Sequence, residues 1–261
     1  MRVLTVYAHH DPRSFCHAVL ERFTAGLTTG GHASEVVDLH AIKFDPVFRG
    51  RDMASYIDAD VPPAVLEQMD PRQRVLDGCR GPVQQWLASR ALRGKSPQQV
   101  AGFIRGHMPK DARPQQEKVA SADGLAIIAP VHFCNFPAIL HGWIERVFTY
   151  GFAYGLTEAA WHGDVTGRRP LLHHKRALIM TSTLFDKAAY DAGIRDAMDK
   201  VIDEWTFRYP GIENVEHVYF YAFYAAAAAP AETIQRYLEQ AYALGCDFDK
   251  PEVTSTGSRP R

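Results

Sequence analysis

Long apolar runs are missing from this chain. No stretch approaches the ~20 consecutive apolar residues that a membrane-spanning helix needs. The start, "MRVLTVYAHHDP", turns polar too early for a secretory signal. The sequence therefore predicts a cytoplasmic protein with no transmembrane segment.

Cysteine is scarce, and its spacing excludes two kinds of small fold. The four cysteines are far apart and include no C-x-x-C pair, which argues against a disulfide framework or a zinc ribbon. Histidine is abundant, with 12 residues, but none falls in an H-x-x-x-H or H-x-x-E-H pattern. We therefore expect no metal site.

An excess of either charge is also missing. The chain has 29 Lys and Arg against 30 Asp and Glu, a formal net charge of −1. Nucleic-acid binding and bulk binding to anionic membranes both need a basic field. The charge balance argues against both, and we expect no nucleic-acid partner.

Short apolar runs alternate with segments of helical periodicity. The predicted strands are 2–8, 33–39, 124–130, 176–182 and 217–223, and the predicted helices are 14–29, 138–150, 191–208 and 231–244. This alternation predicts an α/β fold with a doubly wound parallel sheet, because parallel neighbours need a right-handed crossover. Five strands fit a flavodoxin-like order, 2-1-3-4-5, with helices on both faces.

One long segment interrupts the alternation. We expect a single domain over 1–248 with an excursion at about 41–120, which is rich in Pro, Gly, Arg and Gln. The excursion has helical fragments such as "PVQQWLASRAL" but no clear strand, so we expect helices that pack over a site or a partner subunit. The polar tail 249–261 is predicted to be disordered.

Ligands of such sheets bind beyond the carboxyl ends of the strands. The first loop there, "HHDPRSFCHA", enters a helix at Ser14, where free amides favour a phosphate and Arg13 adds positive charge. It lacks G-x-G-x-x-G and the Walker sequence. Ser14 is equally consistent with a plain helix cap.

The loop after the third strand is aromatic and restrained by prolines. Pro130 and Pro137 bracket His132, Phe133 and Phe136. A planar ring edged by polar atoms suits such a loop, with aromatic walls and backbone donors. The alternative is an ordinary strand-to-helix turn.

Three segments together resemble a known family. "PVHFCNFPAILHGWIERVF", continued by "TYGFAY", is similar to the signature of the flavodoxin-like NAD(P)H:quinone oxidoreductases. This family includes DT-diaphorase, the bacterial modulator-of-drug-activity proteins and the ancillary flavoproteins of potassium-efflux channels. "AHHDPRSFCHA" and "GHMPKDARPQQEKVASAD" resemble the same family. The resemblance covers residues 2 to 245.

The resemblance implies a homodimeric flavoprotein. Such a protein passes a hydride from NAD(P)H to a quinone-like acceptor by a ping-pong mechanism. The long excursion and the "GHMPKD" match favour FAD, with FMN as the alternative. Two other functions stay open: a regulatory flavoprotein bound to a membrane transporter, and a pathway-specific reductase of a specialised conjugated substrate.

The resemblance also implies roles for individual residues. The flavin phosphates and ribityl chain would contact His9, Ser14, Phe15 and Cys16, the last in place of the family's asparagine. The isoalloxazine ring would lie against Pro130, Val131, His132, Phe133 and Cys134, and its pyrimidine edge against Thr181, Ser182, Thr183 and Leu184. Glu145 and Arg146 would lie near the dimer interface and the partner's cofactor, and Tyr154 would border the acceptor pocket.

The loop after the fourth main strand departs from the family pattern. Thr183 and Leu184 replace glycines, so their side chains restrict the approach of the backbone to the ring. Arg195 stands where a histidine is usual, and Tyr190 is one residue out of register with the family's tyrosine. We hypothesise that Arg195 offsets negative charge on the cofactor; the alternative is a solvent-facing helix arginine. His132 and His162 are candidate proton donors, or loop histidines with only a structural role.

Overall fold

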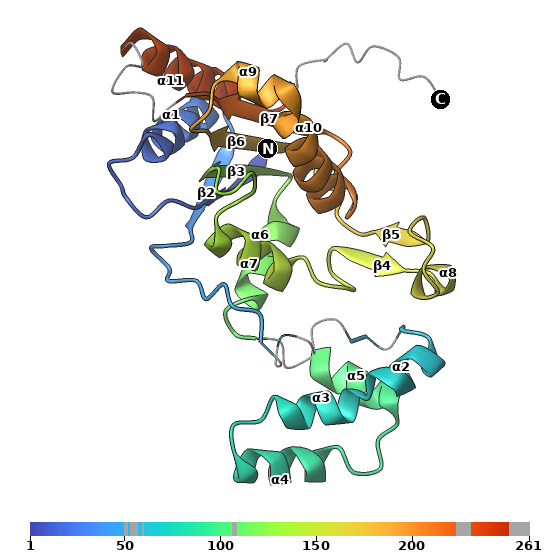
Figure 1. The fold of residues 1–261 in the computed structure, drawn as a ribbon. Helices are drawn as coiled ribbons and strands as arrows, with labels where there is room; N and C mark the ends of the chain where they lie inside the picture. Colours follow the sequence, from blue (N-terminus) through green and yellow to red (C-terminus); the bar gives the residue numbers. More distant parts are fainter. Residues whose placement is uncertain (50–51, 53–56, 59, 106–108, 223–230, 251–261) are drawn as a thin grey trace.

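A computed structural model describes residues 1–49, 52, 57–58, 60–105, 109–222 and 231–250. Five parallel strands form the central sheet, in the order β2-β1-β3-β6-β7 (Figure 1). They are β1 (Arg2–Tyr7), β2 (Ala33–Asp38), β3 (Gly124–Pro130), β6 (Ala177–Ser182) and β7 (Val215–Phe220). Counted within this sheet, the order is 2-1-3-4-5, which confirms the predicted flavodoxin-like fold.

The burial of each strand follows its place in the sheet. Every residue of β3 and of β6 is buried, as continuous apolarity predicts for a strand covered on both faces. The edge strand β2 has mostly exposed or half-buried residues. β7 begins and ends earlier than the predicted 217–223. It ends before Ala222, which adopts a left-handed φ of 55° and donates its amide to the carbonyl of Phe185.

Helices cover both faces of the sheet, as predicted (Figure 1). One face packs against α1 (Phe15–Thr29) and α11 (Ala231–Cys246). The other packs against α6 (Arg113–Ser121), α7 (Ala138–Val147) and the helical run that ends with α10 (Arg195–Met198) and η3 (Asp199–Arg208). Alternate side chains of β1 point to opposite faces of the sheet, so β1 contributes to the core on both sides.

The helix before β7 begins earlier than the predicted 191–208. It starts with α9 (Lys187–Ala189), and a π-helical turn, η2 (Tyr190–Ile194), joins α9 to α10. Gly193, with φ of 127°, kinks this turn. A π-helical stretch widens the helix and is often found near functional sites.

A small antiparallel hairpin was not predicted. α7 ends at Val147 rather than at residue 150, and the chain then forms β4 (Tyr154–Leu156), α8 (Glu158–Trp161) and β5 (Arg168–Pro170). β4 and β5 pair antiparallel. Three-residue strands are too short to leave a readable period in a sequence.

The excursion is helical, and none of its described residues forms a strand. It consists of α2 (Pro63–Met69), α3 (Pro71–Asp77), α4 (Pro82–Ala91) and α5 (Pro97–Arg105), followed by α6. Prolines start α2, α3 and α4, where their missing N–H costs no hydrogen bond. A separate small core that includes Leu66, Leu92 and Val100 packs against Tyr150 and Tyr154.

Most of the predicted disordered tail, residues 251–261, lies outside the described residues. Across the helices that the structure describes, none has the length and apolarity to span a membrane.

Candidate functional site

The loop after β1 ends in a capped helix. Ser14 has extended backbone angles, and its hydroxyl accepts from the amide of His17, 3.2 Å away. A helix supplies no acceptor for its own first amides, and in α1 these begin at Phe15. The side chains of Phe15 and Cys16 are buried in the core. Only their backbone can therefore meet a phosphate.

The polar residues of this loop are organised around Asp11. Its carboxylate accepts from the amide and guanidinium of the exposed Arg13, and these bonds lower its pKa. Its amide donates to His9 Nδ1 at 3.0 Å, so the neutral imidazole carries its proton on Nε2. Burial lowers the pKa of His9. His9 is thus suited to donate one neutral hydrogen bond.

The loop after β3 contains a tight turn with two strained residues. The amide of His132 donates to the carbonyl of Asn135, and the amide of Asn135 donates back to the carbonyl of His132. Between them Phe133 and Cys134 have φ of 50° and 56°, which non-glycine residues rarely adopt and which costs about 1 kcal/mol or more each. The turn leaves the Phe133 side chain fully exposed.

An apolar hollow of about 570 Å³ opens beside this turn, between the β3 loop and the β6 loop. Its lining residues are Val131, His132, Phe133, Cys134, Leu184, Phe185 and Tyr190. The size and the mostly apolar lining are typical of a site for a small organic molecule. The structure thus brings together five residues that sequence reasoning assigned to a ring site and the catalytic candidate Tyr190, and it adds Phe185.

The strand ends hold the two loops in place. The amide of Val131 donates to Ser182 O at 2.9 Å, and the amide of Thr183 donates to Phe220 O at 2.9 Å. The Thr183 hydroxyl donates to Phe185 O. Pro130 and Thr181 lie in the strands themselves and are buried. Backbone spacing at this edge is therefore fixed by the sheet.

Cys16 also joins two of the loops. Its Sγ lies 3.2 Å from the Ser182 hydroxyl, and burial raises the pKa of the thiol to about 11. A thiol with that pKa stays protonated at neutral pH and is a poor nucleophile. Cys134 is exposed in the turn.

Behind the hollow lies a hydrogen-bonded network that sequence reasoning missed. His217 Nδ1 lies 3.0 Å from Asp203 Oδ1, and its Nε2 lies 3.0 Å from the Thr181 hydroxyl. The Tyr219 hydroxyl donates to Asp199 Oδ1 at 2.6 Å. Burial raises the pKa of both Asp199 and Tyr219.

The network is connected like the catalytic triad of a hydrolase, but a substrate cannot reach it. Thr181, His217 and Asp203 are linked as a nucleophile, base and acid would be. The Thr181 side chain is fully buried, so no substrate reaches it. Asp199, Asp203 and His217 also place three potential metal-ligand atoms within 4.8 Å of one another, but these carboxylates and the imidazole already bind each other and Tyr219. We assign the network a structural role.

The sequence carried a signal for this network. His217 and Tyr219 alternate along β7 with Tyr221 just beyond it, so all three point to one face. Arg195, Asp199 and Asp203 recur every four residues and line the facing side of the helix.

Two predicted catalytic residues lie at this network. Tyr190 is buried, its ring lies against Tyr219 and Tyr221, and burial raises its pKa. The Arg195 guanidinium donates to the Tyr221 hydroxyl, and its Cζ lies 5.3 Å from the Tyr219 ring centroid. Arg195 is therefore packed on the aromatic face, not turned to solvent as a surface helix arginine would be.

Glu145 and Tyr154 lie apart from the ring hollow. They line a smaller hollow of about 140 Å³ together with Trp205 and Tyr209. Burial raises the pKa of Tyr154. His162 is exposed at the end of α8, between the strands of the hairpin.

Arg146 is the centre of a buried ion-pair cluster within the chain. It donates to Asp52 Oδ1 at 3.0 Å and to both carboxylate oxygens of Asp111, at 2.7 and 2.9 Å. It also donates to the carbonyl of Asp45. These bonds tie α7 to both ends of the excursion, so in the single chain its guanidinium is fully engaged.

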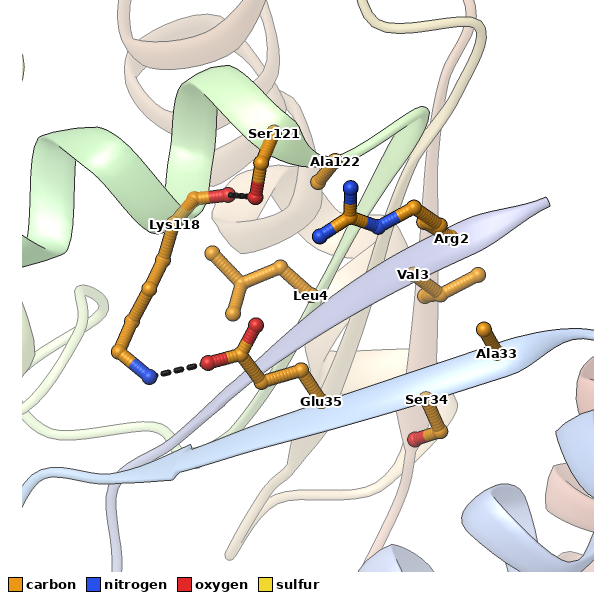
Figure 2. Close-up of a pocket in the computed structure, with 9 residues that line it drawn as sticks. All are labelled: Arg2, Val3, Leu4, Ala33, Ser34, Glu35, Lys118, Ser121 and Ala122. Atoms are coloured by element: carbon orange, nitrogen blue, oxygen red, sulfur yellow. Dashed lines mark hydrogen bonds and ion pairs between the residues drawn. The ribbon is translucent and has the colours of Figure 1, made fainter.

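A further hollow of about 200 Å³ lies at the opposite edge of the sheet, where β1 and β2 begin (Figure 2). Arg2 extends over it, and Lys118 from α6 pairs with Glu35 from β2. Ligands of doubly wound sheets bind at the carboxyl ends of the strands. This hollow is therefore not the site predicted from the sequence.

One family model matches nearly the whole chain and contains all five strands of the sheet. Residues 1–244 match the model of the Flavodoxin_2 family, described as a flavodoxin-like fold. The chain is 28% identical over 220 residues to the ribosyldihydronicotinamide dehydrogenase-like protein traD of Penicillium crustosum, covering 82% of this chain and 70% of that one. It is 28% identical over 219 residues to NAD(P)H dehydrogenase [quinone] 1 of Cavia porcellus, covering 82% and 66%.

Solved structures share the fold of this chain. A putative quinone reductase from Klebsiella pneumoniae is 25% identical, with a TM-score of 0.67 over 95% of this chain and 84% of that one. The NAD(P)H:quinone oxidoreductase from Methanothermobacter marburgensis is 23% identical, with a TM-score of 0.64 over 95% and 97%, a likeness of fold. On sequence, sheet order and site placement together, this chain belongs to the Flavodoxin_2 family.

Proposed function

We propose that the protein is a cytoplasmic flavin-dependent NAD(P)H dehydrogenase (quinone) that reduces a quinone or similar conjugated acceptor by two electrons. Matches to two relatives named NAD(P)H dehydrogenase [quinone] 1 cover 82% and 66% of this chain. The observation that carries the proposal is the aromatic hollow at the carboxyl edge of the sheet, next to a capped helix N-terminus. A bound flavin would supply the hydride acceptor and donor.

The residues of the chain fit such a cofactor. The hollow of about 570 Å³ is walled by Phe133, Phe185 and Tyr190, which suits one face of a planar ring. The start of α1 suits a phosphate group, with His9 Nε2–H as an added donor. Ser182 and Thr183 are held at the ring edge by strand hydrogen bonds. We assign the phosphate to the first loop and the ring to the β3 and β6 loops.

Each side chain then has a simple task. Leu184, exposed at the hollow, limits how closely the ring approaches the β6 loop and shields that side from water. Tyr190 keeps its proton, because burial raises its pKa, and so offers a neutral hydroxyl. His132 lies on the rim, where an imidazole can give a proton to a bound acceptor.

Arg195 acts through its aromatic neighbours. Its guanidinium is bound to Tyr221 and lies over Tyr219, behind Tyr190. A fixed cation in this half-buried place favours negative charge on a nearby ligand. We propose that it is a positioning residue. We also propose that His162 has no part in proton transfer, because it is not among the residues that line the ring hollow.

FAD is the proposed flavin, with FMN as the alternative. The excursion lies between β2 and β3 and adds helices that a short flavodoxin-like chain would not need. We also propose a homodimer, in which the hollow that contains Glu145 and Tyr154 faces the partner's site. The open, partly apolar lining of that hollow supports this.

Steady-state turnover tests the function. With NAD(P)H and a water-miscible quinone, the protein should turn over far faster than an equal concentration of free flavin. Turnover no greater than that of free flavin would favour a regulatory flavoprotein instead.

The role of Arg195 is tested by two variants. Arg195→Ala should slow reduction by NAD(P)H about tenfold or more, and Arg195→Lys should keep part of that rate.

A further inference from the structure

The excursion contains a concentrated patch of positive charge. Residues 71–95 include six Arg and Lys and a single acidic residue, Asp77, in a chain whose total is −1. The near-neutral balance of the whole chain therefore hides a strong local separation. The six are Arg72, Arg74, Arg80, Arg90, Arg93 and Lys95, and all are exposed. We call the helix pair that carries them, α3 with α4 and the residues to Lys95, the basic arm.

None of the six cations forms an ion pair with a carboxylate among the residues that the structure describes. Elsewhere in the chain exposed arginines do find carboxylates, as Arg113 does with Glu117 and Arg169 with Asp60. Charge that is concentrated and not neutralised locally gives a positive field that an anionic surface would meet.

Large apolar side chains stand among these cations. Val83, Trp86 and Leu87 are 71%, 60% and 53% exposed, and α4 buries none of its residues. The guanidinium of Arg90 lies 5.6 Å from the Trp86 ring centroid, so charge and aromatic surface are in contact. Leu87 also borders an apolar hollow of about 400 Å³ between α3, α4 and α5.

The basic arm is also placed where a broad surface can reach it. In Figure 1, α4 lies at the end of the molecule farthest from the central sheet, with α3 beside it. The loops of the candidate flavin site are at the sheet, away from this end. A large partner can therefore meet the arm without covering the site.

We propose that the basic arm binds the surface of a lipid bilayer that contains anionic phospholipids. Interfacial membrane-binding segments combine tryptophan and aliphatic side chains at headgroup depth with arginines that contact lipid phosphates. The basic arm has this composition. Juxtamembrane Lys and Arg are drawn to anionic leaflets. The proposal does not rest on the proposed reaction, although it would bring the enzyme to quinones dissolved in a membrane.

Two other occupants fit less well. A nucleic acid would use aromatic and cationic side chains, but Val83 and Leu87 have no ring on which a base could stack. A stable protein interface buries about 800 Å² on each partner over 20 or more residues. Three large apolar side chains on one short helix supply only a small part of that.

Vesicle sedimentation of the full-length protein, without NAD(P)H, tests the proposal. The protein should sediment with vesicles of phosphatidylglycerol and phosphatidylcholine, stay in solution with phosphatidylcholine alone, and be released by about 0.5 M salt. Arg90→Glu with Arg93→Glu should weaken partition at least tenfold. The charge-matched control Lys43→Glu with Lys200→Glu, at exposed sites on the body of the molecule, should bind at close to the parent level.

Tryptophan fluorescence gives a second readout that does not depend on charge. Anionic vesicles should shift the emission to shorter wavelength, and Trp86→Phe should abolish the shift. Trp205→Phe, which removes a tryptophan 49% exposed in the single chain, should keep it. Circular dichroism and flavin content equal to the parent show that each variant is folded.

Three results would overturn the proposal. Equal binding to neutral and anionic vesicles, or none to either, would exclude an anionic bilayer. Tighter binding to a DNA duplex than to anionic vesicles at the same salt, indifferent to Trp86→Phe, would assign the arm to nucleic acid. A change of oligomeric state in the Arg90 and Arg93 variant, with no vesicle binding by the parent, would assign it to a second copy of the chain.

Discussion

At the scale of single residues, Ser14 combines two tasks that the sequence alone did not separate. Its hydroxyl accepts from the amide of His17 and so caps α1. The same helix end is the proposed phosphate site, and Tyr7, whose pKa is raised to about 12 by burial, stands 3.5 Å from the Ser14 hydroxyl. A cap and a ligand contact make different demands on charge, and this allows them to be tested apart.

Two variants of Ser14 separate the tasks. Ser14→Ala should lower the free energy of unfolding by about 1 kcal/mol, because the cap is lost. Ser14→Asp should keep the stability, since a carboxylate caps well and suits the positive end of the helix, but it should weaken flavin binding at least tenfold by repelling the phosphate. Urea unfolding and flavin titration measure the two effects; equal flavin affinity in Ser14→Asp and the parent would remove the phosphate from this site.

Asp199 gives the buried network a dependence on pH. Burial raises the pKa of this carboxyl above its ordinary 3.8. At a pH between 3.8 and the raised pKa of the folded state, Asp199 holds a proton in the folded protein that it has lost in the unfolded chain. Stability from this group is therefore present at low pH and declines as the pH rises through the folded pKa.

The variant Asp199→Asn should remove that decline. Its amide oxygen can still accept from the Tyr219 hydroxyl. Its free energy of unfolding should exceed that of the parent by an amount that grows as the pH rises above about 4 and then levels off. Chemical denaturation across pH measures this, with Asp196→Asn as the control, since Asp196 is exposed on the same helix. A constant or shrinking difference would mean that the carboxylate is stabilised where it lies.

At the scale of secondary-structure elements, α1 and α11 pack so closely that glycine is required between them. A Cβ on Gly26 would lie 2.1 Å from the carbonyl oxygen of Tyr242, and one on Gly245 would lie 2.3 Å from that of Phe23. Backbone atoms cannot turn aside as a side chain can. This contact seats α1, and with it the helix end that forms the proposed phosphate site.

The variant Gly26→Ala should therefore force the two helices apart. We expect a loss of about 1–3 kcal/mol in the free energy of unfolding and weaker flavin binding. Gly102→Ala is the matched control: Gly102 lies within α5 with no atom within 4 Å of the added Cβ, so it should gain about 0.4–1 kcal/mol. Thermal or urea unfolding of both variants measures the contrast, and equal effects would refute the role of close packing.

The elements that the sequence predicted are those with a clear period or a strong boundary. β3 and β6 are uniformly buried, and α1 is capped by Ser14 before its first residue and by Gly30 after its last. The hairpin β4–β5 left no signal, since it has three residues in each strand and one of these strands is wholly exposed. The π-helical turn at Tyr190 was missed for another reason: it depends on tertiary packing around Tyr219 and Tyr221, not on local propensity.

Prediction of the site had a similar limit. Topology was enough to bring His132, Phe133, Leu184 and Tyr190 to one hollow. It could not reveal that Arg146 meets Asp52 and Asp111, because the pairing joins residues 94 and 35 positions apart along the chain. Long-range polar contacts of this kind have no sequence period.

At the scale of the whole molecule, the proposed flavin site and the basic arm lie in different parts of the fold. The carboxyl edge of the sheet carries an apolar hollow and a helix end. The basic arm is elsewhere, since its helices α3 and α4 lie at the end of the molecule away from the sheet (Figure 1). The small core that includes Leu66 and Leu92 joins the excursion to Tyr150 and Tyr154 of the hairpin region. The excursion therefore supports the hairpin that borders the smaller hollow.

The central claim is that the hollow at the carboxyl edge binds a flavin that cycles between NAD(P)H and a quinone. The most direct measurement is the absorbance spectrum of the purified protein, followed by identification of the cofactor that it releases. We predict a flavin spectrum that is bleached by NAD(P)H without oxygen and restored by a quinone, with FAD released on denaturation. A colourless protein that binds neither added FAD nor added FMN would contradict the account.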